Sequence, residues 1–519
     1  MAVITITRDR LARCDWSFGG LVPLVALEPP AGAGGPRSFS PAYVRVPGRA
    51  SGSMEFEDST KELPLEPVGN VDSSTSIEPG EPKAQEESVQ PRGMTPEIKQ
   101  FIVTSICYLV YTLTDGALRL IVLFNANALN FSAMQIAIMF TLYEFCGMAT
   151  NLLGGILGSR AGLKVTLLSG LTLQITAMVM LCFFDQVLLV ASTTGAMIFV
   201  MFAQSLAGVA KDLVKLSGKS SAKLSTNESD RSRLLKFVSW LTGAKNTVKG
   251  IGFFVGSVLF NYAGYLPALG VLIAFVFVVI PPAVFLLPQG MGKSKNRQPV
   301  TLKQVFKKNY NLNVLSLARM FLFGSRDIWF EIVLPMYMRD ALGWDTTVVG
   351  AFLAAWQILY GAVQSSTPRL VLRPLKCDPP ASSVLAPWTL GLSVIPGVIA
   401  LSLTLLVTLA TQMQAFIAGT TATLVIGLFF FAIVFAINSA LHSYLVLVYT
   451  DKDKVAMNVG FYYMSNALGR LIGVLCSGAL YTYTNQFSLV SCLWVSFVFS
   501  LTAGVVSKFL KPYEMTHSE

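Results

Sequence analysis

The sequence predicts an all-α integral membrane protein with twelve transmembrane helices in two parallel six-helix halves, preceded by a disordered N-terminal extension. Three observations support this prediction: the composition, a series of apolar segments and a partial internal repeat. Of the 519 residues, 53% are hydrophobic and only 13% are charged, whereas a soluble domain has roughly 25% charged residues. So few charges cannot cover the surface of a soluble protein of this length. Part of the surface is therefore expected to face lipid.

Residues 1–97 differ in composition from the rest of the chain. They contain 12 of the 25 prolines, and residues 51–90 carry ten acidic and two basic side chains. Such a segment buries too little apolar surface to fold, so we expect a disordered extension. Its arginines also resemble those of an organelle transit peptide. A gene model that begins upstream of the real initiator, Met54 or Met94, is the alternative.

From residue 100 onward, apolar segments are long enough to cross roughly 30 Å of hydrocarbon. The twelve predicted spans are 100–124, 133–158, 163–184, 187–210, 237–262, 266–287, 311–338, 346–368, 388–410, 416–448, 456–482 and 486–508. We expect a first half over 98–287, a cytosolic central loop over 288–310, and a second half with a short tail over 311–519.

The positive charges between the spans predict the orientation. With residue 100 on the cytosolic side, the inner loops contain 20 Lys or Arg residues and the outer loops contain only Arg339. Because positive residues concentrate in cytosolic loops, both termini are expected in the cytosol. The plasma membrane is the expected location, and an organelle envelope membrane is the alternative.

Four lysines after the fourth span repeat every four residues and would form one stripe on a helix: Lys211, Lys215, Lys219 and Lys223. We expect this stripe to contact anionic lipid headgroups, with recruitment of substrate as the alternative. Over the whole chain, the positive charges are distributed among the segments between the apolar spans rather than gathered on one helical face, so nucleic acid is not an expected partner.

The two halves repeat polar positions in the same order. The matched pairs are Asp115 with Asp327, Glu144 with Gln357, Asn151 with Gln364, Asn246 with Asn466, and residues 202–205 with 435–439. Two parallel six-span halves are the architecture of the major facilitator superfamily, which the chain therefore resembles.

Several longer stretches carry a second resemblance: 114–119, 143–145, 210–213, 243–246, 321–327, 436–444 and 453–463. Through these stretches, residues 98–508 resemble the ArsJ family of arsenic-resistance permeases. The resemblance implies a secondary active transporter that exports the organoarsenical 1-arseno-3-phosphoglycerate and so confers arsenate resistance. It also implies a functional link to glyceraldehyde-3-phosphate dehydrogenase, which forms this compound from arsenate. The alternatives are a permease for another organic anion or a sugar phosphate, and a non-transporting membrane receptor or scaffold.

Charged residues inside the predicted spans are the strongest functional signal apart from the resemblance. A charge at the bilayer centre costs roughly 2.5–3.5 kcal/mol, so such residues indicate a functional, polar interior. There are six cations and four anions: Asp115, Arg119, Glu144, Lys245, Lys249, Arg319, Arg326, Asp327, Glu331 and Arg470.

Four of the cations are the predicted anion-binding residues: Lys245, Lys249, Arg326 and Arg470. Arginine offers a planar fork for phosphate or carboxylate, and lysine offers a point charge. Helix packing and internal ion pairs are the alternative. Adjacent residues point in different directions around a helix, so Arg326 is not expected to pair with Asp327. Arg119 is a further binding candidate, although Asp115 lies one turn away and could neutralise it.

Glu144 is the predicted proton carrier because no cation lies at helical spacing on its own span. Burial would favour its neutral form, and a hydrogen-bonding role opposite Gln357 is the alternative. Further candidates for proton coupling or gating are Asp115, Asp327 and His442. The polar residues expected to line a central cavity are Asn246, Gln357, Asn438 and Asn466.

The sequence offers no signature of an enzyme, a cofactor or a metal site. The seven cysteines are dispersed and there are only two histidines, so neither a disulfide framework nor a metal site is expected. The sequence has no Walker A motif, nucleophile elbow or HExxH motif. ATP-driven transport by this chain alone is therefore not expected.

Overall fold

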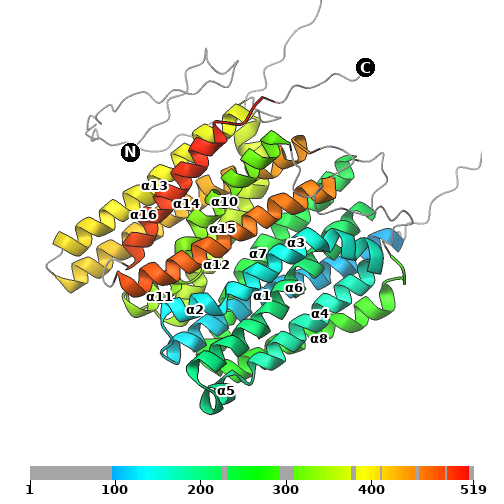
Figure 1. The fold of residues 1–519 in the computed structure, drawn as a ribbon, viewed down its shortest axis with the longest axis horizontal. Coiled ribbons are helices and arrows are strands. Elements are labelled where there is room, and N and C mark those ends of the chain that lie inside the picture. The colour runs from blue at the N-terminus through cyan, green and yellow to red at the C-terminus, as the bar shows by residue number, and fades with distance from the viewer. Residues whose placement is uncertain are drawn as a thin grey trace, which may run out of the picture. The chain divides into compact units, whose positions relative to one another are not determined.

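The structure is a computed structural model of the chain. It describes residues 96–224, 231–291, 309–375, 382–409, 412–450, 455–484 and 488–512. The predicted extension lies almost entirely outside these residues, as does most of the predicted central loop. Every regular element of the described chain is a helix (Figure 1).

The first half contains α1 (Pro96–Ala128), α2 (Ala133–Met139), α3 (Thr141–Ala161), α4 (Leu163–Leu181), α5 (Phe184–Val190), α6 (Thr193–Leu224), α7 (Arg231–Ala263) and α8 (Tyr265–Leu286). The second half contains α10 (Tyr310–Phe330), α11 (Val333–Asp340), α12 (Thr346–Thr367), the short π-helix η2 (Pro368–Leu372), α13 (Ser382–Leu409), α14 (Met413–Val448), α15 (Val455–Tyr483) and α16 (Ser488–Ser507).

Nine segments of the described chain are long and apolar enough to cross a membrane, with α2 and α3 forming one of them. Three further helices, α7, α10 and α15, have 33, 21 and 29 residues. At 1.5 Å per residue, even the shortest of these is about 31 Å long. They carry Lys245, Lys249, Arg319, Arg326, Asp327 and Arg470 within their length. All twelve predicted spans thus fall on helices. Nine of the corresponding segments are also apolar enough to meet the criterion for a membrane span.

Two close contacts join the halves, between α7 and α12 and between α15 and the α2–α3 pair. Glycines permit both contacts. A Cβ atom at Gly250 would lie 2.9 Å from the carbonyl oxygen of Ala354, and one at Gly478 would lie 2.9 Å from that of Ala133. Figure 1 shows α15, in orange, running beside α2 and α3. Side chains of α3 and α15 can therefore meet at this contact.

The helix boundaries differ from the predicted spans in two ways that affect the site. The α6 helix continues to Leu224, so residues 211–224 are helical rather than the beginning of an inner loop. The predicted span 311–338 is interrupted, because α10 ends at Phe330 and α11 begins at Val333. This interruption places Glu331 at a helix end, within the buried part of the protein.

Candidate functional site

Six buried charged side chains gather where helices of both halves meet. They are Arg119 on α1, Glu144 on α3, Arg326 and Asp327 on α10, Glu331 at the end of α10, and Arg470 on α15. Their side chains are at most 15% exposed. Three cations face three carboxylates in this cluster, here called the ion-pair network, and Lys211 lies beside it at 3.8 Å from Glu144.

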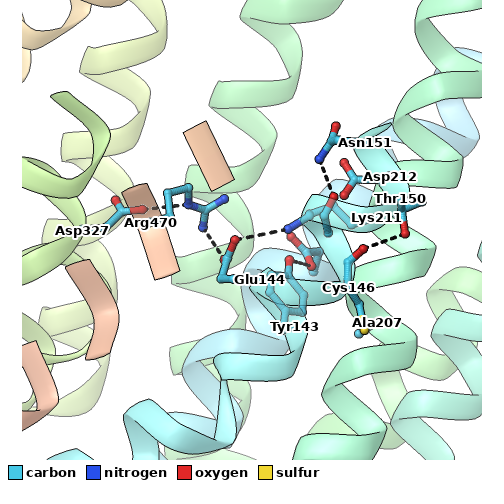
Figure 2. Close-up of polar contacts among 12 residues, drawn as sticks. Tyr143, Glu144, Cys146, Thr150, Asn151, Ala207, Lys211, Asp212, Asp327 and Arg470 are labelled. Carbon is cyan, nitrogen blue, oxygen red and sulfur yellow. Dashed lines mark hydrogen bonds and ion pairs between the residues drawn. The ribbon is translucent and has the colours of Figure 1, made fainter. Parts of the chain in front are cut away.

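Arg470 contacts all three carboxylates of the ion-pair network. Its Nη2 atom lies 2.9 Å from Oε1 of Glu144 and 3.1 Å from Oε1 of Glu331. Its Nε atom donates to Oδ2 of Asp327 at 2.7 Å. Figure 2 shows this guanidinium group between Asp327 and Glu144. Arg470 thereby links α15 of the second half to α3 of the first.

Arg119 makes the second link between the halves. Its Nη2 atom lies 3.0 Å from Oε1 of Glu144, and its Nη1 atom pairs with Oε2 of Glu331. Asp115, the neighbour that could have neutralised Arg119, instead accepts a 2.6 Å hydrogen bond from the hydroxyl group of Tyr143. Arg119 thus pairs with carboxylates of other helices rather than with Asp115 of its own helix.

Arg326 pairs with its neighbour Asp327, contrary to the expectation from their adjacent positions. The Arg326 Nη2 atom lies 2.5 Å from Oδ1 of Asp327. The expectation was wrong because the long arginine side chain can turn back towards the following residue. The other oxygen of Asp327 remains for Arg470.

Glu144 faces three cations, although its own helix supplies none. Besides Arg119 and Arg470, the ammonium group of Lys211 lies 3.8 Å from its Oε2 atom (Figure 2). These cations come from α1, α15 and α6. The prediction of a proton carrier considered only the cations of the same span, and it stays a prediction.

The lysine stripe of α6 faces other helices. The Lys211 ammonium group lies 3.9 Å from the centre of the Tyr143 ring. Lys215 donates to Oδ1 of Asn151 at 2.8 Å and of Asp212 at 3.1 Å. Lys219 donates to the hydroxyl group of Tyr463 on α15 at 3.4 Å. The expected contact with lipid headgroups is wrong for these three lysines because α6 continues as a helix packed on α3. The Lys223 side chain lies outside the described residues.

Lys245 and Lys249 on α7 are two cations of this region that have no carboxylate ion-pair partner in the described chain. Both are half-buried, and Lys249 lies over the Phe253 ring at 5.3 Å. Among the described residues, no carboxylate oxygen forms an ion pair with either ammonium group. Neither ammonium group therefore has a direct carboxylate partner in the described part of the chain.

Arg319 on α10 is a further buried cation, which the sequence analysis counted among the charges but not among the binding residues. It is 5% exposed. Its Nε atom donates to Oδ1 of Asn466 at 3.0 Å, and its Nη1 atom donates to the Ser439 hydroxyl group at 3.4 Å. The sequence did hold a signal, because α10 carries no acid one turn from Arg319.

The predicted polar residues divide between two environments. Asn246 on α7 donates to Oε1 of Gln364 on α12 at 2.9 Å, so it joins the halves. Asn438 bonds within the second half, accepting from Thr389 at 2.7 Å and donating to the Trp388 carbonyl group at 3.1 Å. Gln357 is buried on α12. His442 on α14 is completely buried.

Metal-ligating side chains do not cluster in the described part of the chain, where no group of three His, Cys, Asp or Glu residues could hold an ion. The five described cysteines are all free, four on different helices and Cys182 in the turn after α4: Cys107, Cys146, Cys182, Cys476 and Cys492.

Comparisons with known proteins relate the chain to membrane transporters. The sequence model of the Major Facilitator Superfamily matches residues 104–413. Curated proteins give no match. Similar solved structures include a bacterial homologue of the iron transporter ferroportin in its outward-facing state, with a TM-score of 0.55 and 15% identity, covering 80% of this chain and 99% of that one. A bacterial homologue of ferroportin in its inward-facing state is also similar, with a TM-score of 0.55 and 17% identity. The match covers 78% of this chain and 98% of that one.

A mutant of the nucleoside transporter NupG is also similar, with a TM-score of 0.55 and 14% identity over 80% of this chain and 98% of that one. At such low identity, these structures show a common fold and leave the substrate open.

Proposed function

The chain belongs to the major facilitator superfamily, whose members are secondary transporters, and we propose that it exports an organic anion, 1-arseno-3-phosphoglycerate. The family identifies a multi-pass membrane transporter rather than an enzyme. The proposed direction is outward from the cytosol, with both termini on the cytosolic side. Export of this compound would confer arsenate resistance and would link the transporter to glyceraldehyde-3-phosphate dehydrogenase.

The observation that supports an anionic substrate is that Lys245 and Lys249, both half-buried, form no ion pair with a carboxylate of the described chain. A buried charge is costly unless it is paired. Within the described chain, neither lysine has a carboxylate partner, whereas Arg119, Arg326 and Arg470 each have one or more. A bound anion would supply the missing negative charge. The two lysines therefore become the proposed binding residues, and Arg119 and Arg470 become the proposed link between the halves.

Alternating access requires the contacts between the halves to form and break around the substrate. Arg470 and Arg119 connect α3 to α15 and α1 to the end of α10. Each of their carboxylate partners could be protonated when these contacts open. Glu144 is the proposed proton carrier because it forms the link between α3 and α15 through Arg470, and Asp327, Asp115 and His442 remain secondary candidates.

The arsenic-containing substrate is supported by the resemblance of stretches such as 114–119 and 321–327 to ArsJ permeases. The lysine pair by itself fits any phosphorylated organic anion, so a sugar phosphate is the second candidate. A non-transporting receptor would have no need of unpaired cations between its halves.

Uptake into inverted membrane vesicles tests the proposal. The vesicles receive arsenate, glyceraldehyde 3-phosphate, NAD and the dehydrogenase, and trapped arsenic is measured. We expect uptake that requires the dehydrogenase and falls at least tenfold in Lys249→Gln. The matched control is Lys508→Gln, which removes an exposed lysine beyond the end of α16 and should leave uptake unchanged.

Two results would contradict the proposal. Equal uptake without the dehydrogenase would show that arsenate itself is carried. Normal uptake by both Lys245→Gln and Lys249→Gln proteins would remove the lysine pair from the binding site. Replacing the arsenate system by labelled sugar phosphates tests the second candidate in the same vesicles.

A further inference from the structure

Arg319 differs from the other buried arginines of the described spans in its partners. Arg119 faces two carboxylates, Arg470 faces three, and Arg326 faces one. Arg319 is equally buried, yet within the described chain its hydrogen-bond partners are the neutral Asn466 and Ser439. Its guanidinium group also lies 3.8 Å from the centre of the Phe323 ring. The second half thus holds a buried positive charge without a negative one.

Two more side chains beside Arg319 have unused hydrogen-bonding capacity. His442 is 0% exposed, and neither ring nitrogen has a hydrogen-bond partner. Tyr462 is also 0% exposed, and its hydroxyl group has no partner. Buried polar groups are nearly always hydrogen-bonded, and an exception calls for an explanation such as an absent ion.

The helix positions place these groups around Arg319. His442 lies one turn after Ser439 on α14, and Tyr462 lies one turn before Asn466 on α15. Since Ser439 and Asn466 both bond Arg319, His442 and Tyr462 are displaced from it towards the same end of the bundle, where α14 ends and α15 begins. The Arg319 guanidinium group also lies 5.3 Å from the Tyr462 ring centre.

We propose that Arg319, His442 and Tyr462 form an oxyanion subsite in the second half. A guanidinium group presents a fork of N–H donors to a carboxylate or a phosphate-like group. A neutral imidazole offers one N–H donor, and a phenol offers one O–H donor. The subsite would therefore supply a positive charge and several donors to one anionic group, balancing the charge of Arg319.

This inference rests on the proposed function and refines its substrate class to anions with two charged ends. Hydrogen bonds connect the subsite to α7 beside Lys245. Ser439 accepts from Gln364 at 3.2 Å, and Gln364 accepts from Asn246, the residue after Lys245. Lysines are common phosphate binders, and the arginine fork suits a planar carboxylate. Lys245 and Lys249 would hold the phosphoryl end, while the Arg319 subsite holds the carboxylate or arsenyl end.

Binding to the purified full-length protein in lipid nanodiscs tests this assignment by calorimetry. The probes are 3-phosphoglycerate, which has a phosphoryl and a carboxylate group, and glycerol 3-phosphate, which has only the phosphoryl group. We expect Arg319→Gln to lower the affinity for 3-phosphoglycerate at least tenfold and to change the affinity for glycerol 3-phosphate less than twofold. His442→Leu should lower the affinity for 3-phosphoglycerate several-fold. Lys249→Gln should lower the affinity for both probes, and Arg369→Gln, an exposed control on η2, should lower neither.

Thermal melting separates a binding role from a structural one. Without ligand, the Arg319→Gln protein should melt at a higher temperature than the wild type, because the substitution removes a buried charge that has no carboxylate partner. Adding orthophosphate should raise the melting temperature of the variant less than that of the wild type. Arg326→Gln should melt lower, because Asp327 loses a partner. An Arg319→Gln protein that melts lower and binds 3-phosphoglycerate normally would overturn the subsite.

The same measurements distinguish failure of the inference from failure of the proposed function. If the wild type binds neither organophosphate, the proposed substrate class is wrong. The subsite is then judged by melting alone: a more stable Arg319→Gln protein that has lost stabilisation by orthophosphate supports it, and any other result overturns it.

Discussion

Replacing Arg470 by glutamine tests whether charge balance in the ion-pair network joins the halves. The substitution removes the contacts to Glu144, Asp327 and Glu331 at 2.9, 2.7 and 3.1 Å. Within the network it leaves two cations facing three carboxylates, with Lys211 beside the network at 3.8 Å from Glu144. Each carboxylate nevertheless keeps another cation, because Arg119 contacts both glutamates and Arg326 contacts Asp327.

The expected loss of stability follows from these remaining contacts. Removing one partner of a buried ion pair typically costs 3–5 kcal/mol. Since no carboxylate is left without a cation, we expect the lower end of this range, about 3 kcal/mol, for Arg470→Gln. Adding Glu144→Gln restores two cations facing two carboxylates. The double variant should therefore be more stable than the sum of the single effects predicts, by about 2 kcal/mol, within the range for directly interacting residues.

Unfolding in mixed micelles, followed by tryptophan fluorescence, measures the four proteins of this double-mutant cycle. Trp329 and Trp356 are completely buried and report on the second half. A loss below about 1 kcal/mol in Arg470→Gln would mean that the network contributes little to the junction of the halves. Additive effects in the double variant would refute the argument from charge balance.

Two further predictions concern coupling and packing. Glu144→Gln should abolish gradient-driven accumulation in vesicles but preserve downhill exchange, because only the first requires a proton on Glu144; normal accumulation would remove it as the carrier. Gly256→Ala should destabilise the protein by roughly 1–3 kcal/mol, because a Cβ atom there would lie 2.6 Å from the Ala117 carbonyl oxygen on α1. Gly270→Ala is its control, since a Cβ atom there meets nothing within 4 Å, and equal melting temperatures would contradict the packing argument.

Much of the fold could be predicted because lipid imposes strong constraints on length and composition. Hydrophobic runs located the helices, and repeated polar positions indicated the two halves. The ends of the helices were harder to predict. The α6 helix continues through a segment with four lysines, where composition alone indicated a loop. Its contacts with α3 and α15 keep Lys215 and Lys219 inside the protein, and such contacts cannot be seen in one segment of sequence.

The charged residues of the site could be identified from the sequence, but their partners could not. Arg119 pairs with Glu331, 212 residues away in sequence, whereas helical spacing draws attention to Asp115. Arg326 was grouped with Lys249 as an anion binder, although Asp327 neutralises it. Spacing along one helix describes only local neighbours, so it could not distinguish a compensated arginine from Arg319.

The uncompensated cations have a consequence for the response to membrane potential. In the proposed mechanism, an anion neutralises Lys245, Lys249 and Arg319, so the loaded transporter crosses the field with little net charge in its site. The empty transporter carries that positive charge through its return. Each elementary charge that crosses the whole potential contributes about 2.3 kcal/mol per 100 mV. A potential that is negative inside would therefore return the empty site to the cytosol and favour continued export.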